Sequence, residues 1–168
     1  VMQELKKYNY DDYMESPEGV YYEVIDGYAY NMSPSPTVKH QIISGEIHAQ
    51  LIAALKGKAC TAFIAPLDVV LSHEDIVQPD VFVVCDPSKI TENNIRGTPD
   101  FIIEVLSPTS ILRDKRDKKA LYQRFGVKEY WIVDPERQIT EVYLLQNDYN
   151  PAIYPFDEKI TLAALPGI

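Results

Sequence analysis

The sequence predicts a mixed α/β fold, in which one mixed β-sheet carries two main helices. Three observations lead to this prediction. The 168 residues are 46% hydrophobic, which suits one compact domain spanning residues 1–168. Short runs rich in Val, Ile and aromatic residues recur along the chain and are separated by turn residues. Two longer segments change to the apolar spacing of an amphipathic helix.

The N-terminal part of the chain predicts a β-hairpin. Residues 5–17 are polar and tyrosine-rich, and they indicate a short helix or a loop. Asp26-Gly27 separates two runs of β-branched and aromatic residues, 20–25 and 28–32, which is a strong hairpin signal. The following segment, Ser33–Thr37, contains two prolines and indicates a loop.

A helix and two strands are expected next. Between residues 40 and 56 an apolar residue recurs at every fourth position, at Ile43, Ile47, Leu51 and Leu55. This spacing predicts an amphipathic helix, which Gly57 ends. Two apolar runs, 61–71 and 77–85, are predicted to form the next two strands.

The second half of the chain contains the most apolar run. Residues 100–106 are apolar almost throughout, as expected of a central strand that is buried on both faces. Ser110 is a candidate N-cap for the helix that follows. The other predicted elements are a turn-rich stretch at 86–98, a helix at 111–125 ended by Gly126, and strands at 130–133 and 139–145.

The composition excludes several classes of protein. With 25 acidic and 16 basic residues the net charge is −9, so dense positive charge cannot wrap nucleic acid. The composition does not exclude a local basic patch on an acidic protein. No run of about 18 apolar residues is present, and residues 1–8 lack the apolar core of a signal peptide. We expect a cytoplasmic protein without a membrane partner.

Cys60 and Cys85 are the two cysteines of the chain. Each lies in or beside an apolar, strand-like run, and neither has a neighbour at the spacing of metal ligands. We interpret both as reduced thiols in the core of a cytoplasmic protein.

Two carboxylates belong to apolar runs, and one of them is harder to explain than the other. Glu104 lies inside the central apolar strand, where an unpaired carboxylate costs several kcal/mol unless it binds a cation or a metal. An exposed strand end or a structural lysine partner would explain Glu104 equally well. Asp80 follows Pro79 at the head of an apolar run, and alone it indicates ordinary turn chemistry.

Lys118 belongs to the charged run 113–119, which looks like a solvated surface. At about 100° per residue, however, Lys118 falls within the apolar side of the helix, with Asp114 beside it. That side comprises Ile111, Leu121, Tyr122 and Phe125, whereas the cations predicted to point away are Arg113, Arg116 and Lys119. An inward lysine needs a carboxylate, and Glu104 is the predicted partner. The alternative is a weak Asp114–Lys118 helix pair whose lysine head reaches solvent.

Two carboxylates and a lysine indicate a site for a divalent metal ion, because Asp and Glu oxygens suit Mg²⁺ or Mn²⁺. The three histidines (His40, His48 and His73) do not have a zinc spacing. The sequence also contains no phosphate-binding glycine loop and no nucleophile elbow of a serine hydrolase.

These residues form a familiar pattern. Pro79-Asp80 followed about two dozen residues later by Glu104-Val105-Leu106 resembles the PD-(D/E)XK nuclease signature. Over nearly its whole length the chain resembles the Uma family of bacterial proteins described as restriction endonucleases. The specific blocks are Gly97–Pro108, the Asp114/Lys118/Tyr122 spacing and Gly126–Pro135. Further matches are Tyr22-Glu23, Asp26-Gly27, Ser33-Pro34, His40 and Leu165–Gly167.

The resemblance implies a restriction-endonuclease-like fold, with an αβββαβ core and an N-terminal hairpin. It implies that Asp80, Glu104 and the carbonyl of Val105 bind Mg²⁺, with Mn²⁺ as a substitute. Leu106 stands where the signature has its lysine, so the resemblance moves that role to Lys118, and the catalytic residues become Asp80, Glu104 and Lys118. Five further residues are expected to line the site: Glu23, His40, Glu46, Asp114 and Tyr122. Of the two on the first helix, His40 is better placed than Glu46.

The implied activity is the metal-dependent hydrolysis of phosphodiester bonds in DNA by a homodimer. The hairpin offers an edge for self-association. Two alternatives stay open. The protein could be an inactive binding or assembly module whose ion network is structural, which the acidic composition favours, or a metal-dependent phosphodiesterase acting on RNA. The basic patch available to DNA comprises Arg113, Lys115, Arg116, Lys119, Arg124 and Lys128.

Overall fold

The computed structural model describes residues 6–32 and 35–168, so residues 1–5 and the Ser33-Pro34 part of the expected loop lie outside the described residues. The elements are, in chain order, α1 (Tyr10–Met14), β1 (Tyr22–Ile25), β2 (Tyr28–Asn31), α2 (Val38–Leu55), β3 (Thr61–Ile64), β4 (Val69–Ser72), β5 (Asp75–Val77), β6 (Val81–Val84), a 3₁₀ turn (Pro87–Lys89), β7 (Ile95–Arg96), β8 (Phe101–Val105), a π-helical turn (Arg113–Lys118), α3 (Lys119–Arg124), β9 (Glu129–Asp134), β10 (Ile139–Leu144), a 3₁₀ turn (Leu145–Asn147) and β11 (Pro151–Pro155).

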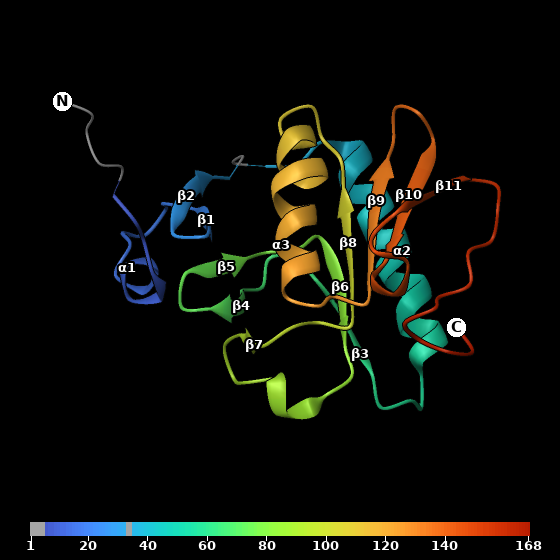
Figure 1. Ribbon diagram of the computed structural model, residues 1–168, viewed down its shortest axis with the longest axis horizontal. Coiled ribbons are helices and arrows are strands. Elements are labelled where there is room, and N and C mark those ends of the chain that lie inside the picture. Colours follow the sequence, from blue (N-terminus) through green and yellow to red (C-terminus); the bar gives the residue numbers. More distant parts are fainter. Residues whose placement is uncertain (1–5, 33–34) are drawn as a thin grey trace.

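The strands form two sheets, so the mixed α/β class is confirmed but the expectation of one sheet is wrong. The smaller sheet has the strand order β2-β1-β5-β4-β7, and the larger has the order β11-β10-β9-β8-β6-β3. Figure 1 shows the smaller sheet beside the larger one, near the N-terminus. None of the helices in residues 6–32 and 35–168 is both long enough and apolar enough to cross a membrane.

The predicted hairpin and first helix are confirmed. Asp26 and Gly27 have φ values of 51° and 80°, which a two-residue hairpin turn requires. Strand β1 also pairs with β5, which leaves β2 at the edge of the smaller sheet. Helix α2 begins two residues earlier than predicted, because the Thr37 side chain caps it by accepting from the His40 N–H at 3.1 Å.

Proline explains why two sheets replace one. The predicted strand 61–71 is interrupted after Ile64 by Ala65-Pro66, and the chain resumes as β4 in the other sheet. The predicted strand 77–85 is interrupted in the same way by Gln78-Pro79, between β5 and β6. Because proline cannot donate to a strand ladder, each run divides and contributes one strand to each sheet. Strand β11, which begins and ends with proline, is an edge strand that the sequence did not predict.

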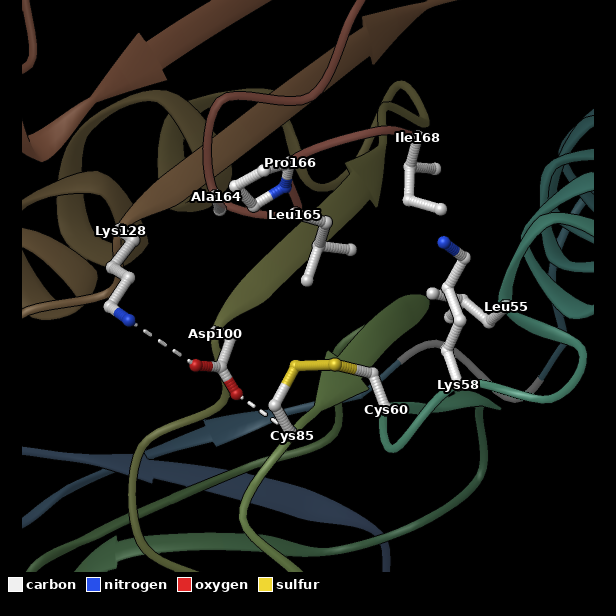
Figure 2. A pocket seen from close by; sticks show the side chains of 10 residues that line it. All are labelled: Leu55, Lys58, Cys60, Cys85, Asp100, Lys128, Ala164, Leu165, Pro166 and Ile168. Carbon is white, nitrogen blue, oxygen red and sulfur yellow. Dashed lines mark hydrogen bonds and ion pairs between the residues drawn. A yellow bond between two sulfur atoms is a disulfide. The ribbon is translucent and has the colours of Figure 1, made fainter.

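Cys60 and Cys85 form a disulfide, so the expectation of two reduced thiols is wrong. The register of β3 with β6 pairs Thr61 with Val84, which places the two cysteines opposite each other at the next position. Their Cα atoms are 4.0 Å apart. Figure 2 shows the bond beside a cavity of about 280 Å³, where the C-terminal segment lies against the end of α2.

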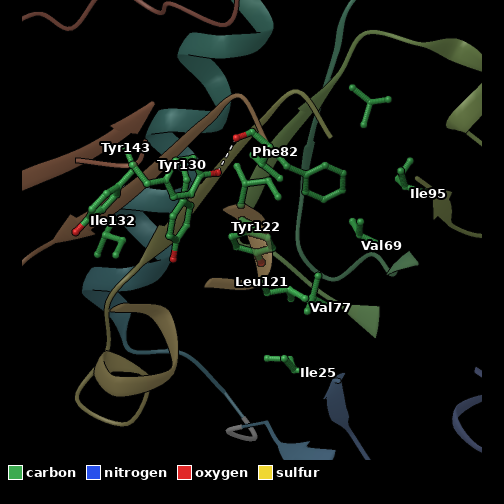
Figure 3. Close-up of a cluster of buried hydrophobic side chains, with 14 of the residues drawn as sticks. Ile25, Val69, Val77, Phe82, Ile95, Leu121, Tyr122, Tyr130, Ile132 and Tyr143 are labelled. Atoms are coloured by element: carbon green, nitrogen blue, oxygen red, sulfur yellow. Dashed lines mark hydrogen bonds between the residues drawn. The ribbon is translucent and has the colours of Figure 1, made fainter. Parts of the chain in front are cut away.

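The larger sheet has a helix on each face. Alternation along β8 directs Phe101, Ile103 and Val105 into a core with Leu51 and Leu55 of α2. Ile102 and Leu106 belong to the opposite core, which contains Leu121 and Tyr122 of α3 (Figure 3). The smaller sheet contributes to this second core through Ile25, Val69, Val77 and Ile95. All five residues of β8 are buried, as expected of a central strand.

The helix expected at 111–125 begins with helical residues 111–112, passes through a π-helical turn, Arg113–Lys118, and continues as α3. A π turn bonds residue i to i+5; such turns are rare and frequently occur at functional sites. The hydroxyl of Tyr130, in β9, donates to the Asp114 carbonyl inside this turn at 2.9 Å. Gly126, with a φ of 76°, ends the helix as predicted.

Candidate active site

The register of the larger sheet brings Asp80 and Glu104 together. Strands β6 and β8 are antiparallel and pair Val81 with Ile103, so Asp80 lies opposite Glu104. The Asp80 N–H donates to Glu104 Oε1 at 2.8 Å, and the Val105 N–H donates to Asp80 Oδ2 at 2.7 Å. The two carboxylates and the Val105 backbone, which the sequence assigned to one site, therefore lie together.

Lys118 points inward from the π turn, and its side chain is 6% exposed. Its Nζ donates a short hydrogen bond to Glu104 Oε2, so the predicted pair is present and the lysine head does not reach solvent. Nζ also lies 3.0 Å from Glu23 Oε2 and 3.9 Å from Asp114 Oδ1. The Tyr122 hydroxyl donates to the same Glu104 oxygen at 3.4 Å. Three carboxylates thus surround one buried ammonium group.

Glu23 reaches this cluster from β1 of the smaller sheet. Its side chain is almost completely buried, and Oε2 accepts the Gln78 N–H at 2.8 Å. Its other oxygen lies 3.8 Å from Nη1 of Arg113, at the start of the π turn. The site is therefore built where the two sheets meet, and each sheet contributes a carboxylate to Lys118.

The structure distinguishes the two candidates on the first helix. His40, in the first turn of α2, places Nε2 at 3.2 Å from Asp80 Oδ2. Its Nδ1 is buried and has no hydrogen-bond partner among the described residues. Glu46 is exposed and accepts from the side chain of Gln50 at 3.2 Å, so α2 does not bring it to the cluster.

Burial and mutual charge set the protonation of the cluster. Burial alone would lower the pKa of Lys118, but Glu104, Glu23 and Asp114 raise it well above its ordinary value, so the ammonium stays charged. Burial raises the pKa of Glu104 above its usual range, against the attraction of Lys118. Burial likewise raises the pKa of Asp114 to about 6.

The pKa values of two flanking side chains, His40 and Tyr122, are also raised. The hydrogen bond to Asp80 raises the pKa of His40, against the opposing effect of burial. Burial raises the pKa of Tyr122 well above its ordinary value, and Glu104 adds to it. Tyr122 therefore remains a neutral phenol that donates to Glu104.

The charges of the cluster favour a divalent cation. Four carboxylates (Asp80, Glu104, Glu23 and Asp114) face two permanent cations, Lys118 and Arg113. When all four are ionised and His40 is neutral, two negative charges are uncompensated, and a bound cation would offset the cost that raises the pKa values of Glu104 and Asp114. Within the described part of the chain, no three His, Cys, Asp or Glu side chains converge closely enough to hold a metal ion. The available set is two carboxylates, Asp80 and Glu104, with the Val105 carbonyl. This oxygen set fits Mg²⁺, which commonly takes one or two carboxylates and keeps several waters.

Most of the basic patch predicted on the second helix faces acidic partners. Lys115 lies 3.1 Å from Glu141, Arg116 lies 3.0 Å from Asp117, Arg124 lies 3.0 Å from Asp75, and Lys128 lies 3.7 Å from Asp100. Lys119 lies over the Tyr143 ring. These contacts offset the positive charge that the sequence alone assigned to this face.

Arg113 belongs to the cluster, although the helical wheel predicted that it points away. The wheel assumes about 100° per residue, whereas a π turn is wider and rotates its residues differently. Gln78 and Tyr130, which hold Glu23 and the Asp114 carbonyl, were also not predicted. Their contributions depend on tertiary packing, for which the sequence has no local signal.

The fold and the site together define the class of protein. A protein from Anabaena variabilis, described as "a putative nuclease belonging to DUF820", has a similar crystal structure with a TM-score of 0.74. It is 25% identical, over 94% of this chain and 89% of its own. The "Uncharacterized protein slr1290" of Synechocystis sp. is 27% identical over 129 residues, which is 76% of this chain and 67% of that protein. The restriction-endonuclease-like fold class is confirmed.

Residues 9–168 match the Uma2 family, described as "Putative restriction endonuclease", and the chain belongs to this family. The resemblance stated from the sequence is therefore confirmed over nearly the whole chain. Both the family and the solved structure place the chain among proteins described as nucleases.

Proposed function

We propose that the protein is a Mg²⁺-dependent endonuclease that hydrolyses phosphodiester bonds in DNA. The observation that carries this proposal is the opposed pair of Asp80 and Glu104, with the buried Lys118 ammonium against Glu104. Membership of a family described as restriction endonucleases supports the same reaction class.

Asp80, Glu104 and the Val105 carbonyl would hold the metal ion. Both Glu104 oxygens already accept from the protein, at Asp80 N and at Lys118 Nζ, but a carboxylate has about four lone-pair sites and can still bind a cation. When bound, Mg²⁺ supplies charge stabilisation at the phosphoryl group and lowers the pKa of water. Mn²⁺ prefers the same oxygen ligands and would substitute for it.

The side chains around the ligands have distinct tasks in this proposal. Lys118, kept charged by its carboxylates, donates a hydrogen bond that orients the attacking water for in-line displacement. Glu23 and Asp114 hold Lys118 in place, and Tyr122 fixes the Glu104 carboxylate. His40 holds Asp80 from the α2 side. Glu46 has no task, because α2 does not bring it to the cluster.

The test is cleavage of supercoiled plasmid by the wild-type protein with Mg²⁺, with Mn²⁺ and with EDTA. We expect cleavage with either metal and none with EDTA, and a loss of at least about 100-fold in Asp80→Asn and Glu104→Gln, because each removes a charged metal ligand. Parallel reactions on single-stranded DNA, duplex DNA and RNA separate the substrates. Cleavage of RNA alone would replace DNA as the substrate, and normal cleavage by Glu104→Gln would refute the assigned site.

A structural ion network is the second candidate function. It is favoured by the existing hydrogen bonds of Glu104 and by the lack of a third converging ligand among the described residues. In that case the protein would be a binding or assembly module that folds around Lys118 and requires no Mg²⁺. Full stability and no metal binding in the wild-type protein would support this candidate over the nuclease.

We further propose that the protein acts as a homodimer, because cutting both strands of a duplex needs two sites. Two surfaces support this proposal: the open edge of β2, and exposed apolar residues of α2 such as Val38 (77%) and Ile42 (65%). Sedimentation equilibrium would show a dimer mass. A monomer at all concentrations, also with DNA, would contradict it.

A further inference from the structure

Arg113 is the more accessible of the two permanent cations in the cluster. Its side chain is 24% exposed, whereas that of Lys118 is 6% exposed. Lys118 is surrounded by Glu104, Glu23 and Asp114, and these three carboxylates compensate its positive charge inside the protein. Arg113 lies at the boundary between this buried charge and solvent.

The guanidinium of Arg113 is held in a defined place by the N-terminal hairpin. Its Nη2 donates to the Asn31 carbonyl at 3.3 Å, and its Cζ lies 5.1 Å from the centre of the Tyr30 ring. Its Nη1 lies 3.8 Å from Glu23. A guanidinium has five N–H groups, and these contacts with described residues leave donors for a ligand.

We infer that Arg113 binds a phosphate oxygen of the nucleic acid strand at the mouth of the site. This inference rests on the proposed nuclease function. A phosphodiester that approaches four carboxylates is repelled, and a fixed cation at the entrance offsets that repulsion. Arginine suits the task because its planar fork matches phosphate geometry.

Tyr30 is the positioning residue for Arg113. Strand β2 carries a second pair of the same kind, since Lys7 lies 5.4 Å from the centre of the Tyr28 ring. Tyr28 and Tyr30 are two residues apart and therefore lie on the same face of β2. The hairpin thus presents one cation on an aromatic ring beside the cluster and another farther along the strand, an arrangement that can follow a nucleic acid backbone.

The test compares Arg113→Gln with Arg116→Gln, a matched control on the same turn. The Arg116 side chain is 71% exposed and contacts Asp117. Steady-state cleavage of plasmid DNA is measured at several salt concentrations, and Mg²⁺ binding is measured by calorimetry. For Arg113→Gln we expect a KM raised at least about tenfold and a salt dependence of kcat/KM shallower by about 0.9 in slope, with unchanged Mg²⁺ affinity.

Conservative changes test the role of Tyr30. Tyr30→Phe keeps the ring and should retain the wild-type KM, whereas Tyr30→Leu should raise it in the direction of Arg113→Gln. If wild type and Arg113→Gln cleave with the same KM and salt slope, this inference is wrong and the nuclease proposal stands. An equal loss in Arg116→Gln would also overturn it, since that result describes a diffuse basic surface. If the wild-type protein does not cleave, the proposed function and this inference fall together.

Discussion

Buried charge is the central feature of the site at the scale of single residues. Counted as whole residues, Lys118, Glu104, Asp114 and Glu23 are each at most 5% exposed, yet all are ionisable. Such groups persist where they compensate one another, and removing one partner leaves an uncompensated buried charge. Sequence patterns could predict Glu104 and Lys118, because each is a charge in an apolar face. The contacts of Glu23 and Arg113 could not be predicted from local patterns, because they depend on how the hairpin packs against the second helix.

Asp114 should make stability depend on pH. Its pKa is raised in the folded protein to about 6, from an ordinary value of 3.8. The folded state therefore binds the proton more tightly, so this contribution to stability is fully present below pH 3.8 and is lost as pH rises through 6. Without metal, Asp114→Asn should gain about 2 kcal/mol relative to wild type between pH 4 and pH 8, because that range covers most of the interval between the two pKa values.

Urea unfolding with EDTA at a series of pH values measures this difference. Asp117→Asn, a substitution in the same turn, reports the background effect of removing one acidic group. Parallel stability curves for wild type and Asp114→Asn would contradict the account.

At the scale of elements, the π turn determines which side chains face Glu104. The sequence predicts a helix here, and the helix is present, but nothing in the run Arg113–Lys118 distinguishes a π turn from an α turn. In the structure, the Tyr130 hydroxyl donates to the Asp114 carbonyl within this π turn. The effect of proline on the strands is easier to recognise in the sequence, since Pro66 and Pro79 mark the points where two predicted strands divide.

Tyr130→Phe should test this element. Loss of the hydroxyl leaves a buried carbonyl without one of its donors, which costs about 1–3 kcal/mol. Because this carbonyl lies in the turn that carries Lys118, cleavage should also fall about tenfold or more. The matched control is Tyr149→Phe, whose hydroxyl donates to the Val127 carbonyl at 2.6 Å, away from the site.

Thermal unfolding and plasmid cleavage separate the two variants. Both should lose similar stability, and Tyr149→Phe should keep its activity at a temperature where it is folded. If both lose activity to the same extent, the Tyr130 hydroxyl has no special relation to Lys118.

At the scale of the whole molecule, long-range pairing determines the two sheets and the disulfide. Pro66 and Pro79 mark where two strands divide, but no local pattern encodes which strands then pair, so one sheet was expected where two are present. The Cys60–Cys85 bond likewise becomes evident only from the register of β3 with β6, because the two cysteines are 25 positions apart along the chain. That the chain folds as one domain over residues 1–168 stays a prediction.

Reduction of the disulfide should lower stability. Opening a loop of this length restores chain entropy to the unfolded state, which corresponds to about 3.5 kcal/mol. We expect urea unfolding with reductant to shift by this amount in the wild-type protein. The double variant Cys60→Ser/Cys85→Ser should unfold identically with and without reductant. A wild-type curve that reductant leaves unchanged would contradict a stabilising bond.

The most direct test of the central claim is a calorimetric titration of Mg²⁺ into the metal-free protein. The account predicts one binding event per chain, lost in Glu104→Gln and retained in Glu129→Gln. Glu129 is a suitable control because it is also fully buried, on the neighbouring strand β9, and accepts from Ala163 and Ala164. Absence of Mg²⁺ binding to the folded wild-type protein would contradict the account and would make the charges around Lys118 a structural network.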